Sequence, residues 1–211
     1  MIDLSHWDTV IDWKPIVRDH AFIALKATQG TGYSDDDLEE SYNAIREHDK
    51  EVLIIPYHFA DSGDVDSEID WFTNQFNKVI PCTDKRVWAC LDFETNGLEE
   101  WATEWFEKFT TRMQDTLLRG RVIQTPLIYS RANLVGIRRP TDKYTNYLWQ
   151  AQYGVQSPDD PENWRRVAWQ YTYSAVQEGM ANKVDFSMVN SAFAEMVGIG
   201  LRRWDIERYR P

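Results

Sequence analysis

The stretch that decides the fold is residues 87–95, VWACLDFET. It joins strand-forming residues to two acidic residues at its end, Asp92 and Glu94. Side chains alternate between the two faces of a strand, so Asp92 and Glu94 share the face of Cys90, whereas Phe93 points the other way. An apolar strand that ends in two carboxylates on one face predicts a polar pocket at one edge of a sheet, because ionised groups are costly to bury.

Seven further strand-like runs recur along the chain, separated by short polar turns. They are residues 1–5, 22–28, 51–60, 126–130, 146–153, 166–173 and 184–189. With residues 87–95 they make eight, the strand number of a small closed barrel. Between the early strands, apolar residues spaced three and four apart predict helices within residues 38–45, 69–80 and 98–117.

Strand followed by helix followed by strand predicts parallel pairing with right-handed crossovers. From about residue 140 onward the connections shorten and strands rich in Trp and Tyr dominate. We therefore predict an α/β fold, a single β/α barrel of the TIM-like type whose final third is mostly β. No linker, repeat or low-complexity block divides the 211 residues, so we expect one domain over residues 1–198 and a short C-terminal tail over residues 199–211.

Four acidic residues are expected to meet at the mouth of this barrel. Catalytic groups of a parallel barrel come from the C-terminal ends of its strands. Asp3 in the first strand and Asp185 in the last become neighbours when the barrel closes, and Asp92 and Glu94 join them. Two carboxylates about 6 to 7 Å apart on one strand repel each other, so one of them tends to keep its proton. Glycoside hydrolysis needs this division of an acid from a base, and we expect Glu94 to be the acid. A salt-bridged or capping pair at a strand end is the structural alternative.

Composition narrows the range of partners. The chain has 23 Lys and Arg against 34 Asp and Glu, and this net charge of −11 repels phosphate backbones and anionic membranes. We therefore expect no nucleic-acid partner. The chain also has no apolar stretch of about 18 residues, so we expect no membrane insertion. Aromatic residues make up 14% of the chain, and aromatic faces stack well on sugar rings.

Other chemistries have weaker support in the sequence. A cluster of four carboxylates can hold Mg²⁺ or Ca²⁺, but no EF-hand loop or H-E-x-x-H helix is present and the four histidines are scattered, so we expect neither a metal nor a cofactor. No G-x-S-x-G elbow supports Ser-His-Asp catalysis. Cys82 and Cys90 form no disulfide or metal pattern, and we expect both to be reduced, with Cys90 buried.

Eight motifs follow one another, one at each expected strand. They are IDLSHWDTVIDW at 2–13, FIALKATQGTGY at 22–33, YHFA at 57–60, LDFE at 91–94, PLIYS at 126–130, LWQAQY at 148–153, AWQY at 168–171 and VDFSMVN at 184–190. In order and spacing they resemble the barrel-strand motifs of glycoside hydrolase family 25, the Chalaropsis-type lysozymes. The resemblance runs from residue 2 to about residue 198.

The resemblance implies a barrel of five β/α units followed by three β units. It also implies cleavage of the β-1,4 bond between N-acetylmuramic acid and N-acetylglucosamine in bacterial peptidoglycan, without a cofactor. Carried over by motif, Glu94 matches the general acid, Asp92 its partner, and Asp3 and Asp185 the aspartates of the first and last strands. Tyr57 matches a tyrosine at the floor of the site. Four more aromatic residues are candidates for stacking on sugars: Trp149, Tyr153, Trp169 and Tyr171.

Several alternatives remain open at the level of sequence. A catalytically silent glycan-binding or virion structural protein could keep the same barrel, and an enzyme on this barrel could act on chitin. The N-terminus lacks the pattern of a secretion signal, so we expect synthesis in the cytoplasm and action on the cell wall as a phage-type endolysin after holin-type release. A bacterial protein exported by another route is the alternative. We expect a monomer, and residues 199–211 are too short for a separate wall-binding module.

Overall fold

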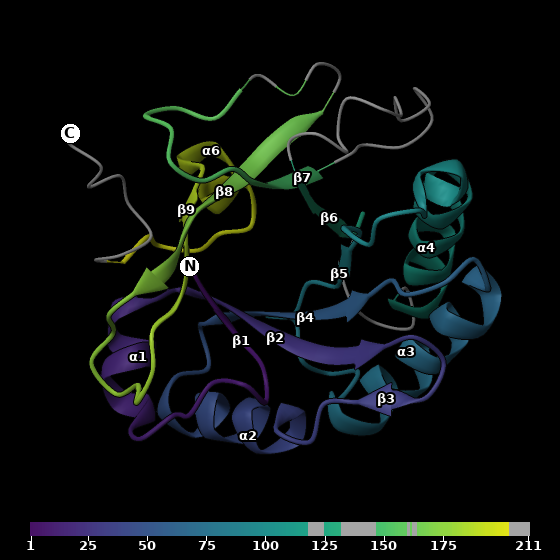
Figure 1. Cartoon of the computed structure of the whole chain (residues 1–211). Helices are drawn as coiled ribbons and strands as arrows, with labels where there is room; N and C mark the ends of the chain where they lie inside the picture. Colours follow the sequence, from purple (N-terminus) through teal and green to yellow (C-terminus); the bar gives the residue numbers. More distant parts are fainter. Residues whose placement is uncertain (118–124, 132–146, 160, 162–163, 203–211) are drawn as a thin grey trace.

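The computed structural model describes residues 1–117, 125–131, 147–159, 161 and 164–202 (Figure 1). Eight strands surround the core: β1 (Ile2–Leu4), β2 (Phe22–Gln29), β4 (Leu53–Phe59), β5 (Cys90–Asp92), β6 (Leu127–Arg131), β7 (Tyr147–Ala151), β8 (Arg165–Ala175) and β9 (Val184–Val189). The strand order is β1-β9-β8-β7-β6-β5-β4-β2-β3, and β1 also pairs with β2, which closes the barrel. The short strand β3 (Tyr33–Ser34) pairs with the end of β2. The predicted barrel of eight strands is confirmed.

The barrel is parallel except around its last strand. Strands β1, β2 and β4 to β8 pair in parallel with their neighbours, whereas β9 is antiparallel to both β8 and β1. The antiparallel pairing of β9 lies in the final third of the barrel, which was predicted to be mostly β. The reason is the short connection between β8 and β9, since an antiparallel pair needs only a hairpin and a parallel pair needs a crossover of a dozen or more residues.

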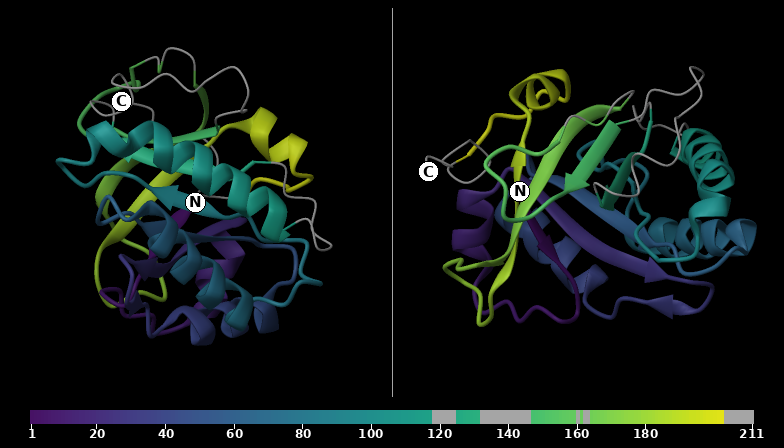
Figure 2. Two further views of the ribbon diagram at one scale, coloured as in Figure 1. Left: turned by 90° about the vertical axis from the view of Figure 1, so that its right-hand side faces the viewer. Right: turned by 45° about the horizontal axis from the view of Figure 1, so that its top comes forward.

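The helices lie outside the barrel (Figures 1 and 2). They are α1 (Trp13–Asp19), α2 (Leu38–His48), α3 (Val65–Val79), the 3₁₀ helix η1 (Glu99–Trp101), α4 (Ala102–Leu117) and α6 (Ser191–Met196). Helices α1 to α4 cover the half of the barrel formed by β1, β2, β4 and β5, as Figure 1 shows. The three predicted helices are confirmed as α2, α3 and η1 with α4, and within the described ranges no helix is long and apolar enough to cross a membrane.

Helix α1 was not predicted, because its seven residues are too few to show a helical period. Its start is nevertheless encoded locally, since the Asp12 side chain accepts a hydrogen bond from the backbone N–H of Lys14 and Pro15 lies in the first turn. The connection that would complete a fifth β/α unit, residues 132–146, lies outside the described residues.

Strand β5 ends earlier than its sequence predicts. Its ladder covers Cys90–Asp92, so Glu94 lies beyond the strand. The predicted alternation is confirmed, since Cys90 is buried and Phe93 packs edge-on against Phe106 of α4 at 5.2 Å between ring centroids. Cys82 and Cys90 are both free thiols.

Gly179 lies in the turn between β8 and β9, next to the residues that begin α1. Its carbonyl oxygen accepts the backbone N–H groups of Ile11 at 2.7 Å and Asp12 at 3.1 Å. Its φ is +94°, and an added Cβ would overlap the carbonyl oxygen of Asp12.

We expect Gly179→Ala to lower the free energy of unfolding by about 2 to 4 kcal/mol, from backbone strain and overpacking together. Gly97 is the matched control, because its φ is +89° and nothing lies within 4 Å of an added Cβ. Gly97→Ala should cost only the strain of its conformation, about 1 to 2 kcal/mol. Thermal unfolding of both variants makes the comparison, and equal losses would contradict the close contact at Gly179.

Candidate active site

Three strands place carboxylates at the mouth of the barrel. Asp3 of β1 and Asp185 of β9 are directly opposite each other in the antiparallel ladder. Asp92 is the last residue of β5 and pairs with Phe59, the last residue of β4. Glu94 follows two residues later, beside β6. The closure of the barrel therefore brings together acidic residues from both ends of the chain.

Each carboxylate acts electrostatically on the others. Burial raises the pKa of Asp3 well above its usual range, and Asp185, Asp8 and Glu94 raise it further. Burial also raises the pKa of Asp92 well above its usual range, followed by the charges of Glu94 and Asp3. The pKa of Asp185 rises to about 6, because of burial first and then Asp8 and Glu94. The structure thus brings the four predicted acidic residues within electrostatic range of one another.

Two buried carboxylate oxygens have no hydrogen-bond partner in the part of the chain that the structure describes: Oδ1 of Asp3 and Oδ1 of Asp92. The Tyr57 hydroxyl donates to Asp3, and Gln170 Nε2 donates to Asp185 Oδ2 at 3.2 Å. A buried polar atom without a partner costs about 1 to 3 kcal/mol. Buried acceptors without a partner in the described part of the chain are suited to the donors of a ligand, such as the N–H and O–H groups of a sugar.

Asp92 and Glu94 differ in burial, although they are only two residues apart. Asp92 is only 8% exposed, and its burial favours the protonated form. Glu94 is more open, and its Oε2 accepts a hydrogen bond from Nε of Arg131 at 2.9 Å within an ion pair. The physical reason is the early end of β5, which encloses Asp92 between β4 and β6 and leaves Glu94 outside the ladder.

Sequence reasoning missed two cations beside the carboxylates, Lys26 and Arg131. Both counteract the rise in the pKa of Asp92. Lys26 Nζ donates to Gln29 Oε1 at 2.8 Å and lies 5.1 Å from the ring centroid of Phe59. A signal for Lys26 was available, because a single lysine inside the apolar strand FIALKAT needs an acidic partner or an opening.

Two of the predicted aromatic residues lie at the mouth. Tyr57 is buried in β4, where its hydroxyl bonds to Asp3 and where burial followed by the charges of Asp3 and Asp92 raises its pKa. Tyr153 is 42% exposed. Burial raises the pKa of Tyr153 to about 12, and the charges of Asp185, Glu94 and Asp3 act in the same direction. Tyr173 was not predicted, but it is 67% exposed and packs edge-on against Tyr153 at 5.3 Å between ring centroids.

The other three stacking candidates do not face the carboxylates with an open ring. Trp149 is 1% exposed and donates from Nε1 to Ser187 Oγ at 2.8 Å, so its faces are closed to a sugar. Trp169 and Tyr171 flank Gln170, which bonds to Asp185 inside the barrel, so strand alternation turns both rings outward. The presence of Trp or Tyr in a strand does not by itself show whether the aromatic ring is part of the core or lines a binding site.

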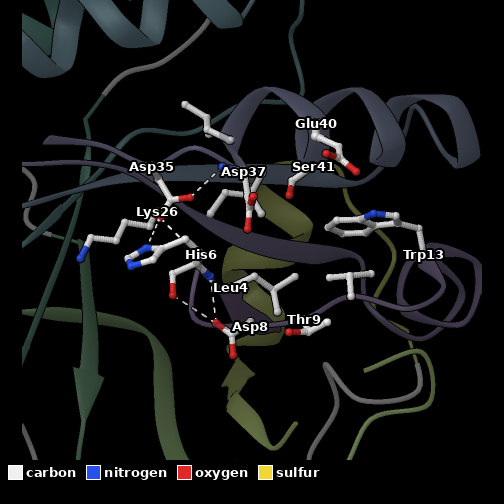
Figure 3. A pocket seen from close by; sticks show the side chains of 14 residues that line it. Leu4, His6, Asp8, Thr9, Trp13, Lys26, Asp35, Asp37, Glu40 and Ser41 are labelled. Atoms are coloured by element: carbon white, nitrogen blue, oxygen red, sulfur yellow. Dashed lines mark hydrogen bonds and ion pairs between the residues drawn. The ribbon is translucent and has the colours of Figure 1, made fainter. Parts of the chain in front are cut away.

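A pocket of about 230 Å³ lies between the chain that follows β1 and helix α2 (Figure 3). Figure 3 shows His6, Asp8 and Lys26 at one side and Trp13 and Glu40 at the other. Asp8 also raises the pKa of Asp3 and of Asp185, which connects this pocket electrostatically to the mouth. No group of three or more His, Cys, Asp or Glu among the described residues could hold a metal ion.

The raised pKa of Asp185 predicts a pH-dependent stability. Asp185 binds its proton more tightly in the folded state, at a pKa of about 6 against an ordinary 3.8. The contribution of Asp185 to the free energy of unfolding is therefore fully present below about pH 3.8 and is lost as the pH rises through about 6. We expect the free energy of unfolding of the wild type to fall between pH 4 and pH 7, by about 1 to 2 kcal/mol from this residue after allowance for its partial exposure. Urea titrations across that range should show a smaller fall for Asp185→Asn, and an unchanged fall would contradict the assignment.

Carboxylates gathered at one end of the barrel, with an adjoining aromatic pair, are typical of a glycosidase. The comparison with family models agrees, since the model of glycosyl hydrolases family 25 matches residues 2–180. The chain belongs to this family and is a glycoside hydrolase.

Individual relatives are distant in sequence and near in fold. Lysozyme M1 of Streptomyces globisporus is 24% identical over 221 residues, covering 94% of this chain and 70% of that protein. The crystal structure of the bacterial lysozyme from Streptomyces coelicolor has a TM-score of 0.73 at 24% identity and covers 97% of both chains. The catalytic domain of endolysin ply40 from bacteriophage P40 of Listeria monocytogenes has a TM-score of 0.70 at 17% identity, covering 93% of this chain and 95% of that one.

Proposed function

We propose that this chain is a lysozyme that hydrolyses the β-1,4 bond between N-acetylmuramic acid and N-acetylglucosamine in bacterial peptidoglycan. Membership of glycosyl hydrolases family 25 and the similarity to Lysozyme M1 support this function. The observation that carries it is the cluster of Asp3, Asp92 and Asp185 around Glu94, in which burial and mutual repulsion raise the pKa of each aspartate. Groups with raised pKa values gathered at one end of a barrel suit acid catalysis near neutral pH.

Glu94 is the proton donor in this proposal. Of the carboxyl groups on the β5 segment it is the more open one, so it can reach the oxygen of a glycan lying across the mouth. It donates its proton to the glycosidic oxygen, the bond from that oxygen to the anomeric carbon breaks, and positive charge develops on the sugar. Water then adds to the anomeric carbon and returns a proton to the carboxylate.

Asp92 stabilises the developing positive charge, directly or through the 2-acetamido group of the substrate acting as nucleophile. Its enclosed Oδ1 without a described partner is suited to the acetamido N–H. Asp3 and Asp185 orient Asp92 and the attacking water. Tyr57 forms the floor of the site, and Tyr153 with Tyr173 offers an exposed aromatic face to the glycan.

The products of purified peptidoglycan test the proposal. Borohydride reduction followed by sugar analysis should show N-acetylmuramic acid at every new reducing end. N-acetylglucosamine at the new ends, or activity on chitin alone, would overturn the choice of bond. Binding to cell walls with no release of sugars would favour a catalytically silent glycan-binding or virion structural protein on the same barrel.

We also propose that the enzyme acts on the cell wall as a phage-type endolysin, as a monomer with its catalytic domain over residues 1–198. The similarity to the ply40 catalytic domain supports this context. Expression in the cytoplasm of a susceptible bacterium should leave growth intact until a holin is co-expressed, and rapid lysis should follow. Lysis without a holin would indicate another route to the wall.

A further inference from the structure

Trp7 is the most exposed tryptophan among the residues that the structure describes, with 78% of its surface open to solvent. It follows Asp3 of β1 by four residues, in the connection that leaves the end of that strand. Its ring packs against the ring of His6, at 4.4 Å between centroids and a tilt of 45°. The indole is therefore supported by a neighbouring ring and stays largely free for a ligand.

The turn that carries Trp7 is held by several hydrogen bonds. The backbone N–H of Asp8 donates to the carbonyl oxygen of Ser5 at 2.8 Å, and the backbone N–H of Ser5 donates to Asp8 Oδ2 at 2.9 Å. Asn182, in the turn between β8 and β9, donates from Nδ2 to Asp8 Oδ1 at 2.9 Å and accepts the backbone N–H of Thr9 at 2.8 Å. A side chain on such a preorganised turn loses little conformational freedom when a ligand binds.

His6 fixes the other side of this turn. Its ring Nδ1 lies 2.9 Å from Oδ2 of Asp35, which also accepts the backbone N–H of His6 at 3.1 Å (Figure 3). The Tyr33 hydroxyl lies 2.6 Å from the same ring nitrogen. Tyr33 belongs to β3, which pairs with the end of β2. His6 thus holds Trp7 on the side of the barrel formed by β1 and β2.

This side lies across the mouth from the exposed tyrosine pair. Tyr153 follows β7 by two residues, and in the closed strand order three strands separate β7 from β2 in either direction. The turn also reaches the carboxylates between the two sides, because the charge of Asp8 raises the pKa of Asp3 and of Asp185. A glycan that lies over the carboxylates and touches Tyr153 at one side would therefore extend toward Trp7 at the other.

We propose that Trp7 is a second sugar-binding platform, on which a distal N-acetylated pyranose ring of the glycan stacks across the mouth from Tyr153 and Tyr173. This inference rests on the proposed function. The C–H face of a pyranose is apolar and packs on an aromatic face, and an uncharged ring is not repelled by the acidic groups nearby. The platform acts only on a glycan long enough to reach it, so Trp7 gives the enzyme a preference for long strands.

Binding of muroglycan oligosaccharides of two lengths tests this inference. The Glu94→Gln enzyme serves as the background, because it should leave the ligand uncleaved during calorimetric titration. Adding Trp7→Ala should raise the Kd for an octasaccharide by about 3- to 10-fold, the loss of one aromatic contact, and should leave the Kd for a tetrasaccharide within twofold. Trp7→Phe, which keeps an aromatic face, should recover most of the affinity for the octasaccharide.

Ile11→Ala is the matched control. Ile11 lies in the same connection and is 71% exposed, but it has no aromatic face. Its removal should leave the Kd for both oligosaccharides unchanged. A loss as large as that of Trp7→Ala would assign the effect to the segment as a whole and would overturn the role of the ring.

A second measurement reports the ring itself. The indole ¹H–¹⁵N signal of Trp7, assigned by its loss in Trp7→Phe, should shift when the octasaccharide is added and should move little with the tetrasaccharide. An unmoved signal, an unchanged Kd for the octasaccharide in Trp7→Ala, or an equal loss for both lengths would overturn the inference. Cleavage of peptidoglycan by the wild type without a Trp7 effect would overturn this inference alone. Length-dependent binding through Trp7 without any cleavage would overturn only the proposed function.

Discussion

Glu94→Gln is expected to lower kcat on purified peptidoglycan by about 10² to 10⁴-fold, the usual contribution of a general acid. The amide has nearly the shape of the carboxyl but cannot give a proton to the leaving oxygen. The fold should be unaffected, because Glu94 lies beyond the end of β5 and its ion pair with Arg131 is partly exposed. A reducing-sugar assay gives the rate, and circular dichroism with thermal unfolding checks the fold.

The control for this substitution is Glu47→Gln. Glu47 is exposed on α2, so the same chemical change there should leave the rate within twofold of the wild type, as surface changes away from a site usually do. A Glu94→Gln enzyme that retains near-normal turnover would remove Glu94 from the role of acid. The next candidate would then be Asp92, whose burial favours the protonated form.

Asp92→Asn is expected to have the second-largest effect, a loss of about 10² to 10³-fold in kcat, as when one preorganised group that stabilises the transition state is removed. Stability should change in the opposite direction. Burial raises the pKa of Asp92 in the folded state, so its favourable contribution is present at low pH and is lost as the pH rises through the folded-state pKa. An uncharged Asn avoids that loss.

The unfolding temperatures of Asp92→Asn and wild type should therefore be similar near pH 4 and diverge toward pH 8, with the variant more stable. Asp66→Asn is the matched control, because Asp66 lies on α3 in an exposed ion pair with Lys108, and its effect on both activity and stability should be small. A variant at Asp92 that loses stability at pH 8 would show that the carboxylate is a structural ion-pair partner and not an electrostatic cost retained for catalysis.

Strand alternation made the centre of this site predictable. The D-x-E spacing predicts that Asp92 and Glu94 share one face of the strand. Closure of the barrel makes the first and last strands neighbours, so the pairing of Asp3 with Asp185 could be predicted from the sequence. These are consequences of a period of two and of a closed sheet, and neither depends on the packing of particular side chains.

The features that were missed depend on where hydrogen-bond ladders end and on what covers each face. Strand β5 ends at Asp92, which buries that carboxyl and frees Glu94 to meet Arg131. Trp149 has the composition of a sugar platform but is enclosed by Tyr129 and Ser187. Such features depend on contacts between strands that are distant in sequence. The sequence of a single strand does not show these contacts.

The most direct test is a crystal structure of Glu94→Gln with a bound muroglycan tetrasaccharide. We expect the side chain at position 94 to lie about 3 Å from the oxygen that links N-acetylmuramic acid to N-acetylglucosamine, within hydrogen-bond reach. Asp92 should face the anomeric carbon, and Tyr153 should contact a sugar ring. A glycan bound outside the mouth, for example along the outer face that carries Trp169, would contradict the proposed site.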